Sequence, residues 1–147
     1  MTKLQALLAG EIPPGLYRYS SRAAAGQLSR EAEQAGWRLF HVEGRSVGDQ
    51  DAFLKAFAEA LNFPNHFGMN WDAFEACLRD LSWLHPEQAK GFVIVYTAAG
   101  LYAKSQPEQW TAALAVLRNA VESWRQTATP MAIVLRGANK TADVEAL

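Results

Sequence analysis

Two uninterrupted apolar runs constrain the fold of this chain more than any other feature. Residues 92–96 read FVIVY and residues 132–135 read AIVL. Strands buried on both faces of a parallel sheet have such continuous runs, whereas half-exposed strands alternate apolar and polar residues. Parallel strands need long crossover connections, which are usually helical and right-handed. The two runs therefore predict an α/β fold.

The segments around these runs carry helical and strand signals. Apolar residues at three- and four-residue spacing, together with capping residues, predict helices over residues 20–36, 49–61, 70–81 and 107–126. Ser20 or Ser21 can cap the first of these helices, and Asp49 can cap the second. Residues 15–19 alternate aromatic and polar side chains, which predicts a short strand at a sheet edge, and residues 37–43 predict a further strand.

The expected architecture is one domain over residues 1–147. We predict a small α/β sandwich with a parallel sheet of three to four strands covered by helices. Its core spans residues 37–136, and residues 1–36 add a strand and a helix. Residues 138–147 show no apolar period and are expected to fray.

Charge is concentrated in the middle of the chain. Residues 43–87 hold eight acidic and three basic side chains, although the net charge of the whole chain is only −1. Nucleic acids need a basic footprint, so this distribution argues against them and leaves a basic protein as a candidate partner. Acids that simply solvate two helices would give the same distribution. The single cysteine cannot form an intrachain disulfide, and the apolar runs are too short to span a membrane. The N-terminus lacks the apolar core of a signal peptide, so we expect a cytoplasmic protein without a membrane partner.

Residues 62–83 hold the features that point most directly to function. A loop with Pro64, His66, Phe67 and Gly68 leads into a helix that Asn70 can cap. Trp71, Phe74, Leu78 and Leu81 are predicted to form the inner face of this helix. Asp72, Glu75 and Arg79 fall at i, i+3 and i+7 and are therefore predicted to share its outer face. The pattern predicts a helix whose inner face packs in the core and whose outer face presents acids to a partner.

These residues resemble the barstar family, the small α/β inhibitors of barnase-type ribonucleases. The resemblance rests on FPxxFGxNWDAF over residues 63–74, followed by Cys77 and Leu78, and it covers about residues 37–136. It implies an inhibitor or immunity protein rather than an enzyme, with no cofactor and no metal. It also implies a toxin or barnase-type ribonuclease as the partner. The partner-binding residues implied or suggested by position are His66, Phe67, Gly68, Asn70, Asp72 and Glu75.

The chain departs from the family pattern at three positions. An aspartate that anchors the family's complexes corresponds to Ala76, a second family acid corresponds to Asn119, and a family tryptophan corresponds to Glu75. Successive helical residues are rotated by about 100°, so Glu75 does not simply replace an acid at position 76. The departures imply an inhibitor of altered specificity. An alternative is a barstar-fold interaction module that no longer inhibits a nuclease.

Three further groups of residues could carry acid–base, metal or thiol chemistry, but each also has a simpler structural role. His41 and Glu43 lie two apart on a predicted strand and could form an acid–base pair, although a structural histidine in a buried strand is the commoner case. His66, Asp72 and Glu75 include only one nitrogen ligand for a metal. Cys77 lies on the apolar side of its helix, which favours a packed thiol over a nucleophile.

Overall fold

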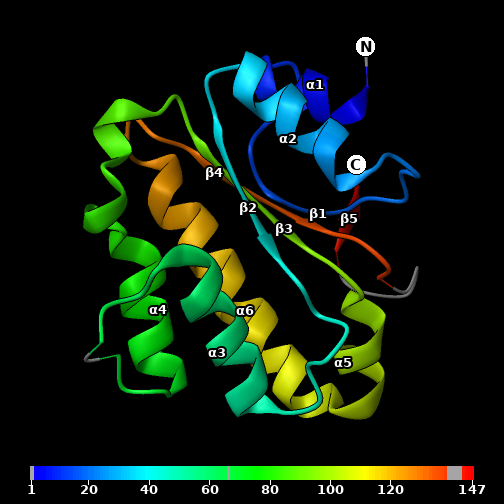
Figure 1. The fold of residues 1–147 in the computed structure, drawn as a ribbon, viewed down its shortest axis with the longest axis vertical. Helices are drawn as coiled ribbons and strands as arrows, with labels where there is room; N and C mark the ends of the chain where they lie inside the picture. The colour runs from blue at the N-terminus through cyan, green and yellow to red at the C-terminus, as the bar shows by residue number, and fades with distance from the viewer. Residues whose placement is uncertain (1, 66, 139–143) are drawn as a thin grey trace.

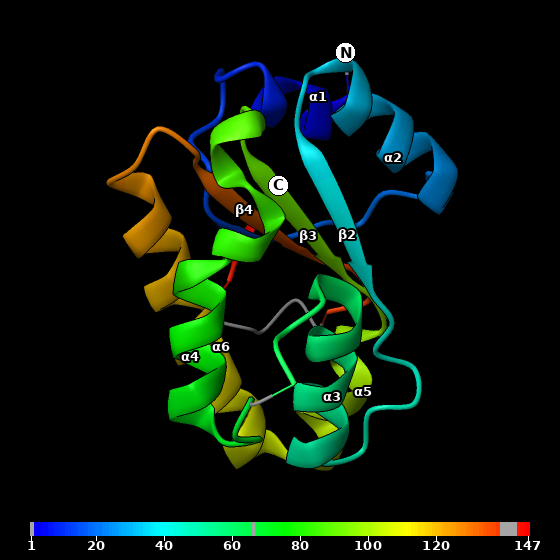
Figure 2. The same ribbon diagram turned by 60° about the vertical axis from the view of Figure 1, so that its left-hand side comes forward.

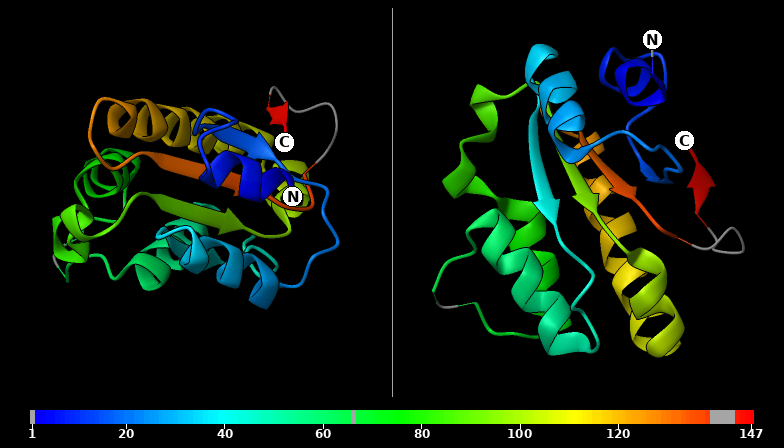
Figure 3. Two further views of the ribbon diagram at one scale, coloured as in Figure 1. Left: turned by 90° about the horizontal axis from the view of Figure 1, so that it is seen from above. Right: turned by 45° about the vertical axis from the view of Figure 1, so that its right-hand side comes forward.

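The described part of the chain forms a sheet of five strands, and neighbouring strands run parallel throughout. The structure, a computed structural model, describes residues 2–65, 67–138 and 144–147. The strand order is β2-β3-β4-β1-β5, and the strand colours in the right-hand view of Figure 3 follow this order. The bounds are β1 (Leu16–Arg18), β2 (Arg38–Val42), β3 (Phe92–Tyr96), β4 (Met131–Leu135) and β5 (Glu145–Ala146). The predicted parallel α/β fold is confirmed.

The helices form two layers on opposite faces of the sheet. One layer contains α1 (Lys3–Leu8) and α2 (Ala25–Gln34). The other contains α3 (Gln50–Leu61), α4 (Trp71–Asp80), α5 (Ala99–Ser105) and α6 (Pro107–Arg125). Two short 3-10 turns, Ser82–Leu84 and Pro86–Gln88, lead from α4 toward β3. Figure 1 shows α1 and α2 separated by the strands from α3, α4 and α6.

The two predicted apolar runs supply both cores. All residues of β3 and β4 are buried. On β3, Phe92, Ile94 and Tyr96 join the core under α3–α6, whereas Val93 and Val95 join the core under α1 and α2. Side chains alternate between the two faces of a strand, so one continuous apolar run serves both layers.

The core under α3–α6 is rich in aromatic rings. Phe53 of α3 lies at its centre and is fully buried. Its ring centroid lies 4.8–5.7 Å from those of five other rings. These rings are Phe57, Trp71, Phe74, Tyr96 and Tyr102. The rings join α3, α4, α5 and β3 into one packed unit.

The N-terminal elements differ from expectation in position and capping. β1 does not lie at an edge, because it pairs with β4 on one side and with β5 on the other. Neither serine caps α2, whose N-cap is Ala24 with no side-chain hydrogen bond. Arg136 Nη2 donates to the carbonyls of Ser21 and Ala23 at 2.7 and 2.8 Å. These contacts hold the chain before α2, and the helix begins only after them.

The C-terminal residues and two short helices also differ from the sequence interpretation. The expected fraying is wrong for residues 144–147, because Val144 is buried and β5 pairs with β1. This strand brings the sheet to five strands instead of three to four. α1 was not expected, although Thr2 and Gln5 form a capping box at its start. α5 was also missed, and it begins after Ala98, a residue with a left-handed φ of 52°.

Candidate functional site

The start of α4 is held by the side chain of Asn70, as the sequence predicts. Asn70 Oδ1 accepts a hydrogen bond from the Ala73 amide at 2.8 Å, and Asn70 Nδ2 donates to the Gly68 carbonyl at 3.3 Å. The preceding residue, Met69, has a φ of 50° and is 39% exposed. A capped first turn and a loop bonded back to the cap residue give the helix a defined start.

The loop before α4 is anchored by one of its aromatic residues. Phe67 is half-buried and packs edge-on against Phe63, with ring centroids 5.1 Å apart. Gly68 is exposed, and a Cβ there would lie 3.4 Å from Asn70 Nδ2, an ordinary contact. The local backbone therefore does not require glycine at this position. His66 lies outside the described residues.

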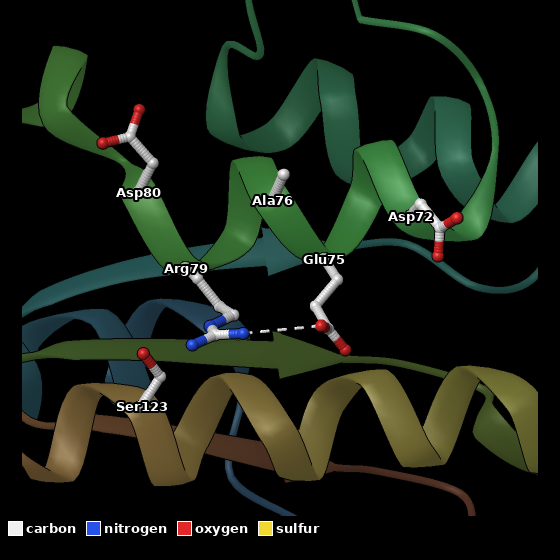
Figure 4. Close-up of a pocket in the computed structure, with 6 residues that line it drawn as sticks. All are labelled: Asp72, Glu75, Ala76, Arg79, Asp80 and Ser123. Atoms are coloured by element: carbon white, nitrogen blue, oxygen red, sulfur yellow. Dashed lines mark ion pairs between the residues drawn. The ribbon is translucent and has the colours of Figure 1, made fainter.

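Three charged residues lie on the outer side of α4, as predicted from their spacing. Asp72 is exposed, and among the described residues no hydrogen bond or ion pair to its side chain is present. Glu75 Oε2 lies 3.5 Å from Arg79 Nη1, and Glu75 Oε1 accepts a hydrogen bond from Asn119 Nδ2 of α6 at 3.0 Å. In Figure 4 the side chains of Glu75 and Arg79 extend from α4 toward α6. Two of the positions that depart from the family pattern, 75 and 119, thus meet in one contact.

A shallow groove runs between α4 and α6, which lie side by side in Figures 1 and 2. It has a volume of about 520 Å³. Its lining residues are Asp72, Glu75, Ala76, Arg79, Asp80 and Ser123. A smaller hollow of about 260 Å³ continues along α6 and shares Arg79 and Ser123 with it. The lining of the larger groove carries three carboxylates and one guanidinium, so the groove is negatively charged overall.

The inner side of α4 fixes it on the rest of the molecule. Phe74 and Leu78 are fully buried, and Trp71 is half-buried against Phe53 at 5.7 Å between centroids. Trp124 Nε1 of α6 donates to the Leu78 carbonyl at 2.8 Å, in the last turn of α4. The predicted inner face is confirmed. The helix that carries the outer carboxylates is therefore held in place by packing on its inner side.

Sequence reasoning missed the contribution of α6 to this site. Asn119 and Ser123 lie one turn apart on α6 and both face the groove region, Asn119 through its bond to Glu75. Their four-residue spacing on an otherwise amphipathic helix was the available signal. Nothing in the sequence indicated which neighbouring helix they would face.

His41 and Glu43 have separate partners. His41 Nε2 lies 3.4 Å from Ser29 Oγ, and His41 is exposed because β2 is an edge strand, so the expectation of a histidine in a strand buried on both faces is wrong. Glu43 accepts hydrogen bonds from Thr97 Oγ1 at 2.7 Å and from the Arg45 amide at 2.9 Å. These bonds lower the pKa of the Glu43 carboxyl, the Thr97 hydroxyl contributing most. The arrangement gives Glu43 a role in joining the ends of β2 and β3.

The remaining candidates for chemistry are few. Cys77 is half-buried against the aromatic core, and burial, followed by the nearby Asp80, raises the pKa of its thiol. A raised pKa disfavours the nucleophilic thiolate. Within residues 2–65, 67–138 and 144–147, three or more metal-ligating side chains do not gather at any point. None of the helices in the same residues combines the length and apolar character that a membrane crossing requires.

Comparisons with known proteins agree with the observed architecture. A search of curated proteins gives no match. A solved structure described as "Structure of the Aeropyrum Pernix ORC2 protein (ADPNP-ADP complexes)" superposes with a TM-score of 0.59 at 14% identity, over 92% of this chain and 38% of that chain. At this identity the likeness concerns the fold alone. The model of the family described as "Barstar (barnase inhibitor)" matches residues 37–136, which include β2, α3, α4, β3, α5, α6 and β4. The chain therefore belongs to the barstar family.

Proposed function

We propose that this chain is a non-catalytic immunity protein that binds and inhibits a basic ribonuclease in the cytoplasm. The binding surface, called here the α4 surface, consists of His66, Phe67, Gly68, Asn70, Asp72 and Glu75. The exposed carboxylate of Asp72 is the observation that carries this proposal. Asp72 stands in the first turn of a capped helix, free of intramolecular partners among the described residues, where a cation of a partner can reach it.

Charge supports a basic partner. Asp72, Glu75 and Asp80 line the groove beside α4, against the single cation Arg79. A cleft lined mainly by one sign of charge raises the rate at which an oppositely charged protein associates. A ribonuclease binds a polyanion and therefore presents cations in its own cleft. The α4 surface offers carboxylates where such an enzyme would otherwise hold phosphates.

Rigidity supports an inhibitor, because tight binding favours a surface that is already ordered. The Asn70 cap holds the start of α4, and the Trp124 bond to the Leu78 carbonyl holds its last turn. The ring contact between Trp71 and Phe53 supports the first turn from below. A preorganised surface loses less conformational entropy on binding than a mobile one.

The proposal is tested by titrating purified basic ribonucleases, a barnase-type enzyme and several toxin nuclease domains, with the wild-type chain and with Asp72→Asn. We expect Asp72→Asn to weaken inhibition of the true target at least about tenfold, because close charge pairs between barnase and barstar couple by about 1.5–7 kcal/mol and the lower end of that range is about tenfold. Glu33→Gln is the matched control, because Glu33 is an exposed acid on α2, across the sheet. Equal inhibition by wild type and Asp72→Asn would contradict the role of Asp72.

A second candidate is a barstar-fold module that binds a protein other than a nuclease. It is favoured by one observation, the exposed and uncharged Ala76 in the middle of α4. A purified non-nuclease partner that binds through the α4 surface, together with no inhibition of any ribonuclease in the panel, would select this alternative.

A further inference from the structure

We propose that Glu75, positioned by Asn119, selects the target by receiving an arginine or lysine side chain of the partner in the groove between α4 and α6. This inference rests on the proposed function and specifies how that surface discriminates among basic partners. The contact between Glu75 of α4 and Asn119 of α6 is called here the bridge. The inference assigns target selection to this bridge rather than to the total charge of α4.

The bridge gives Glu75 a fixed orientation. Asn119 Nδ2 donates to one carboxylate oxygen from α6 at 3.0 Å, and Arg79 Nη1 lies 3.5 Å from the other oxygen. The Glu75 side chain is 28% exposed, whereas that of Arg79 is 51% exposed. An exposed glutamate normally samples several rotamers and loses that freedom on binding. The hydrogen bond from Asn119 of α6 restricts Glu75 before a partner arrives.

The bridged carboxylate can still accept hydrogen bonds. An ionised carboxylate offers about four lone-pair sites, and Asn119 and Arg79 leave part of this capacity unused. The ion pair with Arg79 is solvent-exposed, and pairs of this kind are weak and readily exchanged. Asp72 and Asp80 also line the groove, so its charge favours a cation as occupant. A long basic side chain is the occupant that combines this charge with the reach to enter between two helices.

The position of the bridge supplies the discrimination. The next residue along α4, Ala76, is exposed and offers no charge, and in Figure 4 its methyl group points away from α6. A partner whose base stands over the middle of α4 would leave that base unpaired, which costs binding free energy. A partner whose base projects toward α6 meets Glu75.

The experiment compares two charge-neutralising variants on the same helix. In Glu75→Gln the carboxylate held by α6 is lost. In Asp80→Asn an acid that lines the same groove is lost, but its side chain points away from α6 in Figure 4. We expect Glu75→Gln to weaken binding of the inhibited ribonuclease at least tenfold and Asp80→Asn to weaken it less than threefold. Binding is measured by biolayer interferometry, and thermal melting verifies that both variants are folded.

Asn119 is tested as a positioning residue with a double-mutant cycle. Asn119→Ala alone is expected to weaken binding about fivefold. In a Glu75→Gln background the same substitution should cause no further loss, because Asn119 acts through the carboxylate. A structural role of Asn119 that is independent of Glu75 would give the same loss in both backgrounds.

The outcomes separate this inference from the proposed function. Inhibition of no ribonuclease by the wild-type chain overturns the proposed function and this inference with it. Inhibition that is lost in Asp72→Asn but unchanged in Glu75→Gln overturns the inference alone. Equal losses for Glu75→Gln and Asp80→Asn would also overturn it, because total charge would then explain binding.

Discussion

The two helical layers pack on opposite faces of the same sheet through different kinds of side chains. The α3–α6 layer packs on a network of aromatic rings centred on Phe53, whereas the α1–α2 layer packs mainly on aliphatic side chains such as Leu4, Leu7 and Leu28. Helix α4 begins with a side-chain cap at Asn70, whereas α2 begins at Ala24 without one. The candidate binding surface lies on the aromatic side. The difference indicates that the helix that presents the candidate acids is supported by a denser network of ring contacts than α2 is.

The largest expected effect comes from removing the central ring of the aromatic layer. Phe53→Ala should lower the free energy of unfolding by about 3–5 kcal/mol, because it deletes a fully buried ring with many ring neighbours. Leu28→Ala, its counterpart under α2, should cost about 2–3 kcal/mol, near the lower end of the range for buried leucines. Urea denaturation of both variants measures the difference. A larger loss for Leu28→Ala than for Phe53→Ala would contradict the proposed difference between the two layers.

An intermediate effect is expected at the two helix starts. Asn70→Ala should lower the free energy of unfolding by about 1 kcal/mol, because the first turn of α4 loses its acceptor. Ala24→Asp should raise it by up to about 1 kcal/mol, since Ala24 is exposed and already has the extended backbone of a cap residue. Thermal unfolding at pH 7 measures both changes. If Ala24→Asp gives no gain, the missing cap is not a weakness of the α1–α2 layer.

The smallest effect tests the join between β2 and β3 and depends on pH. Thr97→Val removes the hydroxyl that donates to Glu43 and accepts a hydrogen bond from the Gly44 amide, and it should cost about 1 kcal/mol at pH 7, since Glu43 is exposed. The pKa of Glu43 is lowered in the folded chain, so its contribution is present above its ordinary value of about 4.3. It is lost as pH falls through the lowered pKa. The stability difference between wild type and Thr97→Val should therefore narrow from pH 7 to pH 3, leaving only the part due to the Gly44 bond. A difference that is the same at every pH would contradict the assignment.

The sequence predicted the elements whose signals are local. The runs in β3 and β4, the Asp49 and Asn70 caps and the apolar stripe of α6 each depend on neighbouring residues, and all are confirmed. The inner position of β1 and the existence of β5 depend on strand pairing between distant segments. Such pairing leaves no periodic signal in three- and two-residue strands.

The same distinction holds for the candidate site. The exposed Asp72 and the shared outer face of α4 follow from helix geometry and were predictable. The contact between Glu75 and Asn119 joins residues 44 positions apart, and it required the packing of α4 on α6. In the sequence, positions 75 and 119 are two separate departures from the family pattern. In the structure, one hydrogen bond joins them.

The dependence of the association rate on ionic strength tests the central claim most directly. Stopped-flow fluorescence would follow the wild-type chain and Asp72→Asn binding to the inhibited ribonuclease at several salt concentrations. An acidic α4 surface predicts a wild-type rate constant that falls steeply as salt rises, with a shallower slope for Asp72→Asn. A rate constant that is independent of salt, or equal slopes for the two proteins, would contradict it.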